Sequence, residues 1–166
     1  NFLASKIAQE VYPHVNHDLN FLRMYQTRAL STDRTPGTHP IQQQLANLNS
    51  AGLLYGNIIY EKAPVMMRKL EEQMGAQRFR EGLQEYLRTY SYGNASWDDL
   101  ISILDRHAPE AHLKSFSEAW VKQKGMPTIS VTWNDNKLII RQQDPYKRGL
   151  CWQQKFTVDA YYQNRM

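Results

Sequence analysis

The chain has 166 residues, of which 42% are hydrophobic and 22% are charged, and its formal net charge is +4. This composition is that of a folded globular domain and excludes an intrinsically disordered chain. No apolar run reaches the roughly 20 residues of a membrane-spanning helix, and no continuous basic stripe or nucleic-acid-binding motif is present. We therefore expect no membrane span and no nucleic-acid partner. The single cysteine, Cys151, excludes an intrachain disulfide and a cysteine metal cluster.

Two helices joined by a short turn are predicted at the N-terminal end. The apolar residues that recur there at helical spacing are Phe2, Leu3, Ile7 and Val11. They predict a helix over residues 1–11, which Pro13 ends, and a second helix is predicted over residues 17–29. An ordered loop rich in turn-forming residues, a short helix and a chain break are expected to follow, over residues 31–40, 41–47 and 49–52.

The clearest helical pattern in the sequence follows that break. Its apolar residues, three or four positions apart, are Ile59, Ala63, Met66, Leu70 and Met74. They predict one continuous buried stripe. Pro64 is tolerated in the first helical turn, so the helix is expected to begin close to Tyr60, and Gly75 is expected to cap its end. Tyr60 is one residue, or about 100°, away from the stripe. It is therefore expected at the edge of the buried face.

Three further helices are predicted, over residues 76–90, 96–107 and 110–123. In the first of them the expected inward residues are Phe79, Leu83, Tyr86 and Leu87. Ser96 and Asp99 form a capping-box pattern at the start of the second helix. In the third helix the expected inward residues are Leu113, Phe116, Ala119 and Trp120.

The hydrophobic period then changes to two, which is typical of β-strands. Ile129, Val131 and Trp133 alternate with polar residues, residues 138–141 read as a return strand, and residues 151–158 predict a third strand. We expect a mainly α fold, in which a lobe of five to seven helices precedes two or three antiparallel strands. The expected boundary separates residues 1–125 from residues 126–166. The second part is too short for a core of its own unless it packs on something else.

Few residue patterns in the chain point to chemistry. His14 and His17 are three residues apart, but Pro13 disrupts their surroundings and no third ligand is identifiable. The sequence contains no H-E-x-x-H motif, no glycine-rich phosphate loop and no G-x-S-x-G motif. We therefore expect no metal site in this chain. Tyr60 is the one candidate, because a phenol at a helix start can donate a hydrogen bond to a developing oxyanion.

Several motifs together resemble one enzyme family. Ile59-Tyr60-Glu61-Lys62-Ala63 is similar to the Tyr-Glu/Asp-Lys-Gly motif of the gluzincin zinc aminopeptidases related to alanyl and leucyl aminopeptidase. His39-Pro40-Ile41 resembles the family's upstream Ser-His-Pro-Ile loop, and Asn94-Ala95-Ser96-Trp97-Asp98-Asp99-Leu100 resembles a later helix start. The link from helices to strands contributes further matches at Trp120, Gln123, Gly125 and Pro127. The resemblance covers about residues 28–158.

The resemblance implies an activity, a cofactor and two site residues. The family removes N-terminal residues from peptides, with zinc and a glutamate base activating a water and a tyrosine stabilising the oxyanion. Tyr60 matches that tyrosine, and Tyr55 matches a position that lines the first specificity pocket. For Tyr55, a packed aromatic is an equally good reading. The family's zinc ligands lie outside the matched region. The resemblance thus implies a zinc-dependent parent, a fragment that is inactive alone, and the rest of the catalytic domain as partner.

One departure from the family motif leaves a second hypothesis open. The family glycine after Tyr-Glu-Lys is replaced by Ala63, which is followed by Pro64. A side chain at this position could shift the backbone that carries Tyr60. The alternative is a non-enzymatic helical interaction module, or a degenerate relative that keeps the scaffold without the chemistry.

Overall fold

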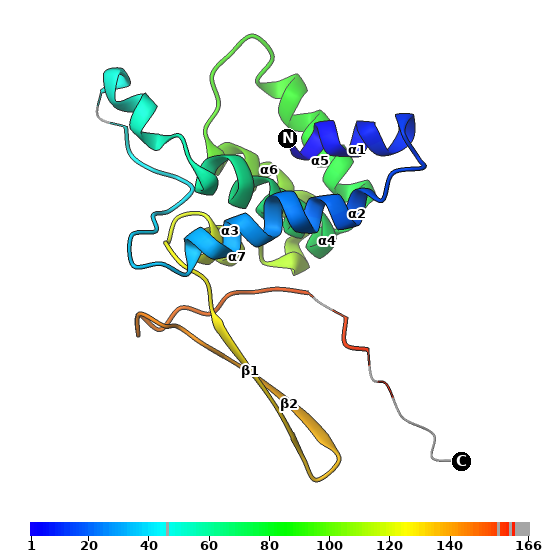
Figure 1. Cartoon of the computed structure of the whole chain (residues 1–166). Coiled ribbons are helices and arrows are strands. Elements are labelled where there is room, and N and C mark those ends of the chain that lie inside the picture. Colours follow the sequence, from blue (N-terminus) through cyan, green and yellow to red (C-terminus); the bar gives the residue numbers. More distant parts are fainter. Residues whose placement is uncertain (46, 156, 160, 162–166) are drawn as a thin grey trace.

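The computed structural model describes residues 1–45, 47–155, 157–159 and 161 (Figure 1). Helices dominate the first 120 residues, and an antiparallel hairpin follows them. The α-helices are α1 (Phe2–Val11), α2 (His17–Phe21), α3 (Thr27–Asp33), α4 (Ala63–Met74), α5 (Ala76–Thr89), α6 (Trp97–His107) and α7 (Leu113–Trp120). The strands are β1 (Thr128–Asn134) and β2 (Lys137–Gln143). The expected mainly α lobe followed by antiparallel strands is confirmed.

The second helix extends further than its sequence predicted. The π-helical turn η1 (Leu22–Gln26) joins α2 to α3, so the chain stays helical from His17 to Asp33 and does not end near Ala29. The residues at the end of α3 have turn-forming side chains, which explains the prediction of a loop there. Asp33 is nevertheless buried, with 2% of its surface exposed, and its contacts inside the lobe keep this last turn in place.

The segment between α3 and α4 also differs from its prediction. Residues 41–45 and Asn47 are not helical, and Ala46 lies outside the described residues. The 3₁₀-helix η2 (Leu48–Leu54) instead covers the stretch expected to break the chain. Asn47 caps this helix, because its side chain accepts a hydrogen bond of 2.9 Å from the backbone N–H of Asn49. In Figure 1 this short helix stands apart from the rest of the helical lobe.

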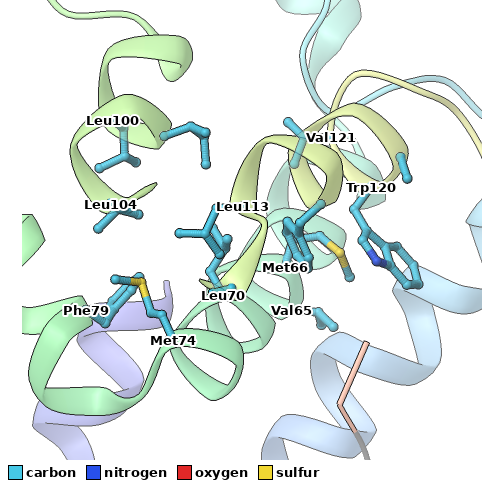
Figure 2. Packing of buried hydrophobic residues seen from close by; sticks show 14 of the residues in the cluster. Val65, Met66, Leu70, Met74, Phe79, Leu100, Leu104, Leu113, Trp120 and Val121 are labelled. Atoms are coloured by element: carbon cyan, nitrogen blue, oxygen red, sulfur yellow. The ribbon is translucent and has the colours of Figure 1, made fainter. Parts of the chain in front are cut away.

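The hydrophobic core lies around α4 (Figure 2). Met66, Leu70 and Met74 from α4 are at most 3% exposed, as the apolar stripe predicted. They pack with buried residues from the other helices, among them Phe79, Leu104, Leu113, Phe116 and Trp120. Burying a large apolar side chain contributes about 1.5–3 kcal/mol, so these residues account for much of the stability of the lobe. The core is therefore built around the apolar stripe of α4.

A second π-helical turn, η3 (Ile58–Lys62), precedes α4 and alters the predicted stripe. The sequence pattern placed Ile59 on the buried face, but Ile58 is the fully buried residue and Ile59 is only half-buried. A π-helical turn holds one more residue than an α-helical turn. The position that faces the core is therefore shifted by one residue toward the N-terminus.

Helix α7 is shorter than predicted, and helix α5 is less buried than predicted. α7 begins at Leu113, because His112 has a left-handed backbone with φ of 50° and separates α7 from the 3₁₀ turn η4 (Pro109–Ala111). The expected inward face of α7 is buried in full. On α5 only part of the prediction holds, since Phe79 is buried but Leu87 is 64% exposed. The capping box at Ser96 and Asp99 is confirmed.

The hairpin projects from the helical lobe (Figure 1). Its strands pair in antiparallel register, with Val131 opposite Ile140 and Trp133 opposite Leu138. Every side chain of β1 is exposed. The apolar face predicted by the alternating pattern therefore exists, but no described part of the chain covers it.

The predicted third strand over residues 151–158 is wrong for the residues that the structure describes, with Phe156 outside that set. Trp152, at the start of this segment, is instead fully buried in the core of the helical lobe. The Nε1–H of Trp120 donates a hydrogen bond of 2.9 Å to the carbonyl of Gln153. A tryptophan buries more apolar surface in the lobe than it would on an exposed two-stranded ribbon. The chain thus returns from the hairpin to the helices.

Candidate active site

Tyr60 lies in the π-helical turn η3, immediately before α4. The backbone N–H groups of Ile59 and Tyr60 both donate to the carbonyl of Gly56, over 3.1 and 3.0 Å. The side chain of Asn1 donates to the carbonyl of Tyr60 over 3.0 Å and so ties the start of α1 to this turn. The Tyr60 ring itself is 50% exposed. Its backbone is thus held on both sides while its phenol faces outward.

Tyr55, the second predicted site residue, lies beside Tyr60. The two ring centroids are 5.8 Å apart and the ring planes are inclined by 39°. This spacing is typical of a favourable aromatic pair. Tyr55 is 66% exposed, so it is not a packed core aromatic. The structure therefore brings both predicted tyrosines together on one surface.

A shallow, mainly apolar groove of about 410 Å³ adjoins this pair. Its lining comes from the start of α1 and from the η3–α4 segment, namely Asn1, Phe2, Leu3, Ile59, Tyr60, Ala63, Pro64 and Met67. A hollow of about 510 Å³ lies elsewhere, between the base of the hairpin and the end of α4, and neither tyrosine lines it. Tyr60 is thus at the edge of a groove that could receive an apolar group.

Ala63, where the family motif has glycine, does not distort this turn. Its φ and ψ are −60° and −45°, which any L-residue adopts in a helix. Pro64 is the second residue of α4, and the Tyr60 carbonyl, four residues before it, accepts a hydrogen bond from the Asn1 side chain in place of the missing Pro64 N–H. Ala63 therefore has ordinary helical dihedral angles at the position where the sequence departs from the family.

A buried polar cluster lies behind Tyr60, on the inner side of the same turn. Lys62 and Asp33 are each 2% exposed, and Lys62 Nζ lies 2.7 Å from Asp33 Oδ2. Thr38 Oγ1 donates to Asp33 Oδ1 over 2.9 Å, and the backbone N–H of Gly125 donates to the same oxygen over 3.1 Å. Lys62 Nζ also donates to the carbonyl of Gly125 over 3.3 Å. We call these four residues the Lys62 cluster.

Burial sets the electrostatics of this cluster. Removal from water lowers the pKa of the Lys62 ammonium, and the adjacent Asp33 carboxylate opposes that change. Arg148 lowers the pKa further by charge repulsion. The carboxylate of Asp33 meets three donors, which is what a buried charge requires.

Glu61 is the third charged residue near the tyrosine. Its Oε1 accepts a hydrogen bond of 3.3 Å from Arg28 Nη1. Among the described residues its other carboxylate oxygen, Oε2, has no hydrogen-bond partner although it is buried. Arg28 is half-exposed, so this ion pair is only partly shielded from water.

The described residues do not form a metal site. Within them, no group of three or more His, Cys, Asp or Glu side chains is arranged to hold a metal ion. The two histidines that the sequence singled out have other contacts, because His17 Nε2 lies 2.8 Å from the Tyr12 carbonyl and His14 packs edge-on against the Tyr12 ring.

None of the helices that the structure describes is both long and apolar enough to cross a membrane.

Sequence reasoning missed most of the Lys62 cluster. In the sequence Lys62 stands out only as part of the motif, and Asp33 and Thr38 fall in the predicted ordered loop over residues 31–40. A signal was nevertheless present, because an aspartate among turn residues is a hydrogen-bond acceptor that can cap a neighbouring backbone. Its partner, 29 positions further along the chain, could not be paired with it from spacing alone.

Comparisons with known proteins identify the family of this chain. Residues 1–120 match the family model described as the peptidase family M1 domain. The chain is 29% identical over 139 residues to tricorn protease-interacting factor F2 of Thermoplasma acidophilum, an alignment that covers 84% of this chain and 18% of that protein. It is 32% identical over 116 residues to aminopeptidase M1-C of Oryza sativa subsp. japonica, covering 70% of this chain and 13% of that protein.

A human relative shows the same relation. The chain is 29% identical over 141 residues to the thyrotropin-releasing hormone-degrading ectoenzyme of Homo sapiens, which covers 80% of this chain and 13% of that protein. The chain therefore spans less than a fifth of the length of each of these relatives. The resemblance to the zinc aminopeptidases drawn from the sequence motifs is confirmed. Because the family match takes in most of its residues, this chain belongs to peptidase family M1.

Proposed function

We propose that this chain is part of a longer aminopeptidase, in which Tyr60 stabilises the oxyanion formed when a peptide bond is attacked. The observation that carries the proposal is an outward-facing phenol on a turn with a firmly held backbone, in a chain of a peptidase family. The Tyr60 hydroxyl donates a hydrogen bond to the carbonyl oxygen of the scissile bond as negative charge develops there. Such a preoriented donor stabilises the transition state more than the substrate.

Tyr55 is proposed to contact the N-terminal residue of the peptide. Its exposed ring beside Tyr60 supports this role, because a side chain bound against one ring lies next to the other. An aromatic ring offers a large apolar contact surface at little cost in conformational entropy. The groove of about 410 Å³ at Tyr60 provides apolar surface on the other side of that tyrosine.

Zinc is implied by the family, and the described residues do not fit it. We therefore propose that the zinc ligands and the general base belong to another part of the longer protein, and we assign no step of the reaction to a metal held by this chain. On this proposal the isolated chain is inactive. Its share in the chemistry is the hydrogen bond from Tyr60.

The rest of the catalytic domain is the proposed partner of this lobe. Three of the apolar residues that recur at helical spacing in α1, Leu3, Ile7 and Val11, are 54–62% exposed. Leu19 and Leu22 are about half-exposed as well. A face of this kind commonly marks a contact with another protein surface.

Residues 126–166 are proposed to begin a β-sandwich-like domain, since the hairpin also has an uncovered apolar face.

The proposal is tested by Tyr60→Phe in the longer protein. We expect kcat to fall roughly 10²–10³-fold, the loss that follows removal of one oxyanion donor, while zinc content stays unchanged. Tyr92→Phe is the matched control, because Tyr92 is fully exposed at the turn after α5 and loses the same hydroxyl group. It should leave kcat unchanged.

Near-normal turnover of the Tyr60→Phe enzyme would refute the role of this tyrosine. A longer protein that binds no zinc and cleaves no peptide would favour the alternative, a non-enzymatic helical module. The ordinary helical dihedral angles of Ala63 weigh against that alternative, because alanine is accommodated there without a strained backbone.

A further inference from the structure

The Lys62 cluster has no role in the proposed chemistry, yet Lys62 belongs to the same helical turn as Tyr60, two residues further along. We propose that Lys62 and Asp33 are positioning residues, which fix the orientation of the Tyr60 side chain by holding the inner side of its turn. The inference rests on the proposed function, since it assumes that the Tyr60 hydroxyl has a target to meet.

The first argument is that Tyr60 needs an external constraint. Among the described residues no hydrogen-bond partner of the Tyr60 hydroxyl is found, and half of the residue is exposed. Its direction therefore depends on the backbone turn that carries it and on the contact of its ring with Tyr55. That turn is π-helical, closed by a hydrogen bond from Ala63 N to the Ile58 carbonyl. Such turns are less regular than an α-helix and occur often at functional sites.

The second argument is geometric. Successive residues of a helix are turned by about 100°, so residues two positions apart point to nearly opposite sides. Lys62 is 2% exposed and Tyr60 is 50% exposed, in agreement with this expectation. Any rotation of the turn about its own axis moves both side chains together. Contacts that hold the buried Lys62 side chain therefore limit rotation of the turn, and with it the position of the Tyr60 Cα.

The third argument is that the cluster is rigid. Lys62 Nζ is held at once by the Asp33 carboxylate and by the Gly125 carbonyl. Asp33 is held in turn by donors from Thr38 and from the Gly125 backbone. The four residues come from the end of α3, the loop after it, η3 and the link to β1. In a buried site such hydrogen bonds are stronger than at the surface and leave little freedom of movement.

Gly125 connects this cluster to the segment that returns from the hairpin. Its φ of +87° favours glycine, and a Cβ built there would lie 2.8 Å from the Tyr146 ring. The Tyr146 hydroxyl donates to the Thr35 carbonyl over 3.2 Å, and Arg148 Nη1 donates to the Lys124 carbonyl over 2.9 Å. The segment that contains Gly125 is thus held in place by Tyr146 and Arg148 of the returning chain.

The test is a comparison of two backgrounds in the longer protein. The double variant Asp33→Leu/Lys62→Met removes both charges together, because removing one alone would leave a buried charge without a partner. With Tyr60 intact, we expect kcat per zinc-loaded molecule to fall about 10- to 10²-fold, since a misplacement of about 1 Å has an effect of that size. In the Tyr60→Phe background the same double variant should lower kcat less than about two-fold, because no hydroxyl is left to misplace.

Two outcomes would overturn the inference. Equal losses of kcat in both backgrounds would mean that the cluster supports folding alone. An unchanged kcat with Tyr60 intact would mean that it does not position the tyrosine at all. Either result leaves the proposed function standing if Tyr60→Phe alone is strongly impaired. Normal turnover of Tyr60→Phe alone would instead refute the proposed function, and the inference with it.

A milder variant and a control keep the test decisive if the double variant fails to fold. Thr38→Val deletes only the hydroxyl that bonds Asp33 and should show the same dependence on Tyr60, with a smaller loss of kcat. Lys122→Met is the matched control, because Lys122 pairs with Asp98 and Glu118 at the surface, over 2.8 and 3.0 Å. It should leave kcat unchanged in both backgrounds.

Discussion

Helix α4 at the centre of the lobe and the hairpin have equally clear amphipathic patterns in the sequence, but only α4 buries its apolar face. Leu70 of α4 is fully buried, whereas Val131 of β1 is 58% exposed and Ile140, opposite it, is 37% exposed. A hydrophobic period tells which side of an element is apolar. It does not tell whether the same stretch of chain contains what covers that side.

The difference extends to what holds each region together. The lobe is stabilised by packing of several helices around one core. A two-stranded hairpin alone is marginally stable in water, so this one depends on its base. There the turn after β2 bonds to the lobe through Tyr146 and Arg148, and Trp152 inserts into the core.

The largest expected effect comes from truncating matched apolar residues in the two regions. Leu70→Ala should lower the free energy of unfolding by about 2–5 kcal/mol, because it leaves a cavity in a core that cannot close around it. Val131→Ala should cost less than about 1 kcal/mol, since the side chain is already largely in water. Urea unfolding of both variants measures the difference. If Val131→Ala costs as much as Leu70→Ala, the hairpin face is covered in the intact protein.

A smaller effect is expected at the junction of the two regions. Gly125→Ala should cost about 1–3 kcal/mol, because alanine must adopt a positive φ and its Cβ meets the Tyr146 ring. Gly149→Ala is the control, with a φ of +77° and open space around its Cβ, and should cost roughly 1 kcal/mol. The unfolding midpoints of the two variants give the comparison. Equal costs would show that the contact with Tyr146 contributes nothing to the junction.

The smallest expected effect concerns the turn that follows β2. Burial raises the pKa of the Asp144 carboxyl, but hydrogen bonds from Arg148 and from the backbone of Tyr146, Arg148 and Leu150 outweigh this and bring it to about 2. Because the pKa is lowered on folding, the carboxylate stabilises the fold fully at a pH above its ordinary pKa of 3.8. This stabilisation is lost as the pH falls through the folded-state pKa of about 2.

Asp144→Asn should therefore cost about 1 kcal/mol at neutral pH, because the amide loses the charge but its oxygen still accepts part of the hydrogen bonds, and progressively less as the pH falls from 3.8 to about 2. The measurement is the difference in unfolding free energy between variant and parent across that range. Asp135→Asn, in the exposed hairpin turn, is the control and should show no such dependence. A cost at Asp144 that does not change with pH would contradict the assigned ion pair.

Local patterns were enough to predict much of the lobe. The capping box at Ser96, the apolar stripe through Leu70 and the buried face of α7 follow from hydrogen bonding and helical period alone. The predicted element boundaries that are wrong depend on features that the hydrophobic period of the sequence does not contain. The π-helical turn at Ile58 shifts the buried register by one residue, and the left-handed His112 delays the start of α7 to Leu113. The strand predicted at Trp152 gave way to burial in a distant core.

The residues of the candidate site were likewise predictable only in part from the sequence. The motif singles out Tyr60 as a candidate, and the family resemblance adds Tyr55, five residues earlier. The Lys62 cluster could not be predicted, because its members are brought together by tertiary structure. An ion pair between Lys62 and Asp33 becomes visible only when α3 is seen to continue to Asp33 and to end against η3.

The placement of the tryptophans makes the junction observable by fluorescence. Trp120 and Trp152 meet edge-on with their ring centroids 6.3 Å apart, where the returning segment joins the lobe. Trp133, on the hairpin, is 59% exposed. Emission from the first pair is therefore blue-shifted while the returning segment is seated, and it moves toward the red when that segment detaches. Trp133 reports separately whether another surface comes to cover the hairpin.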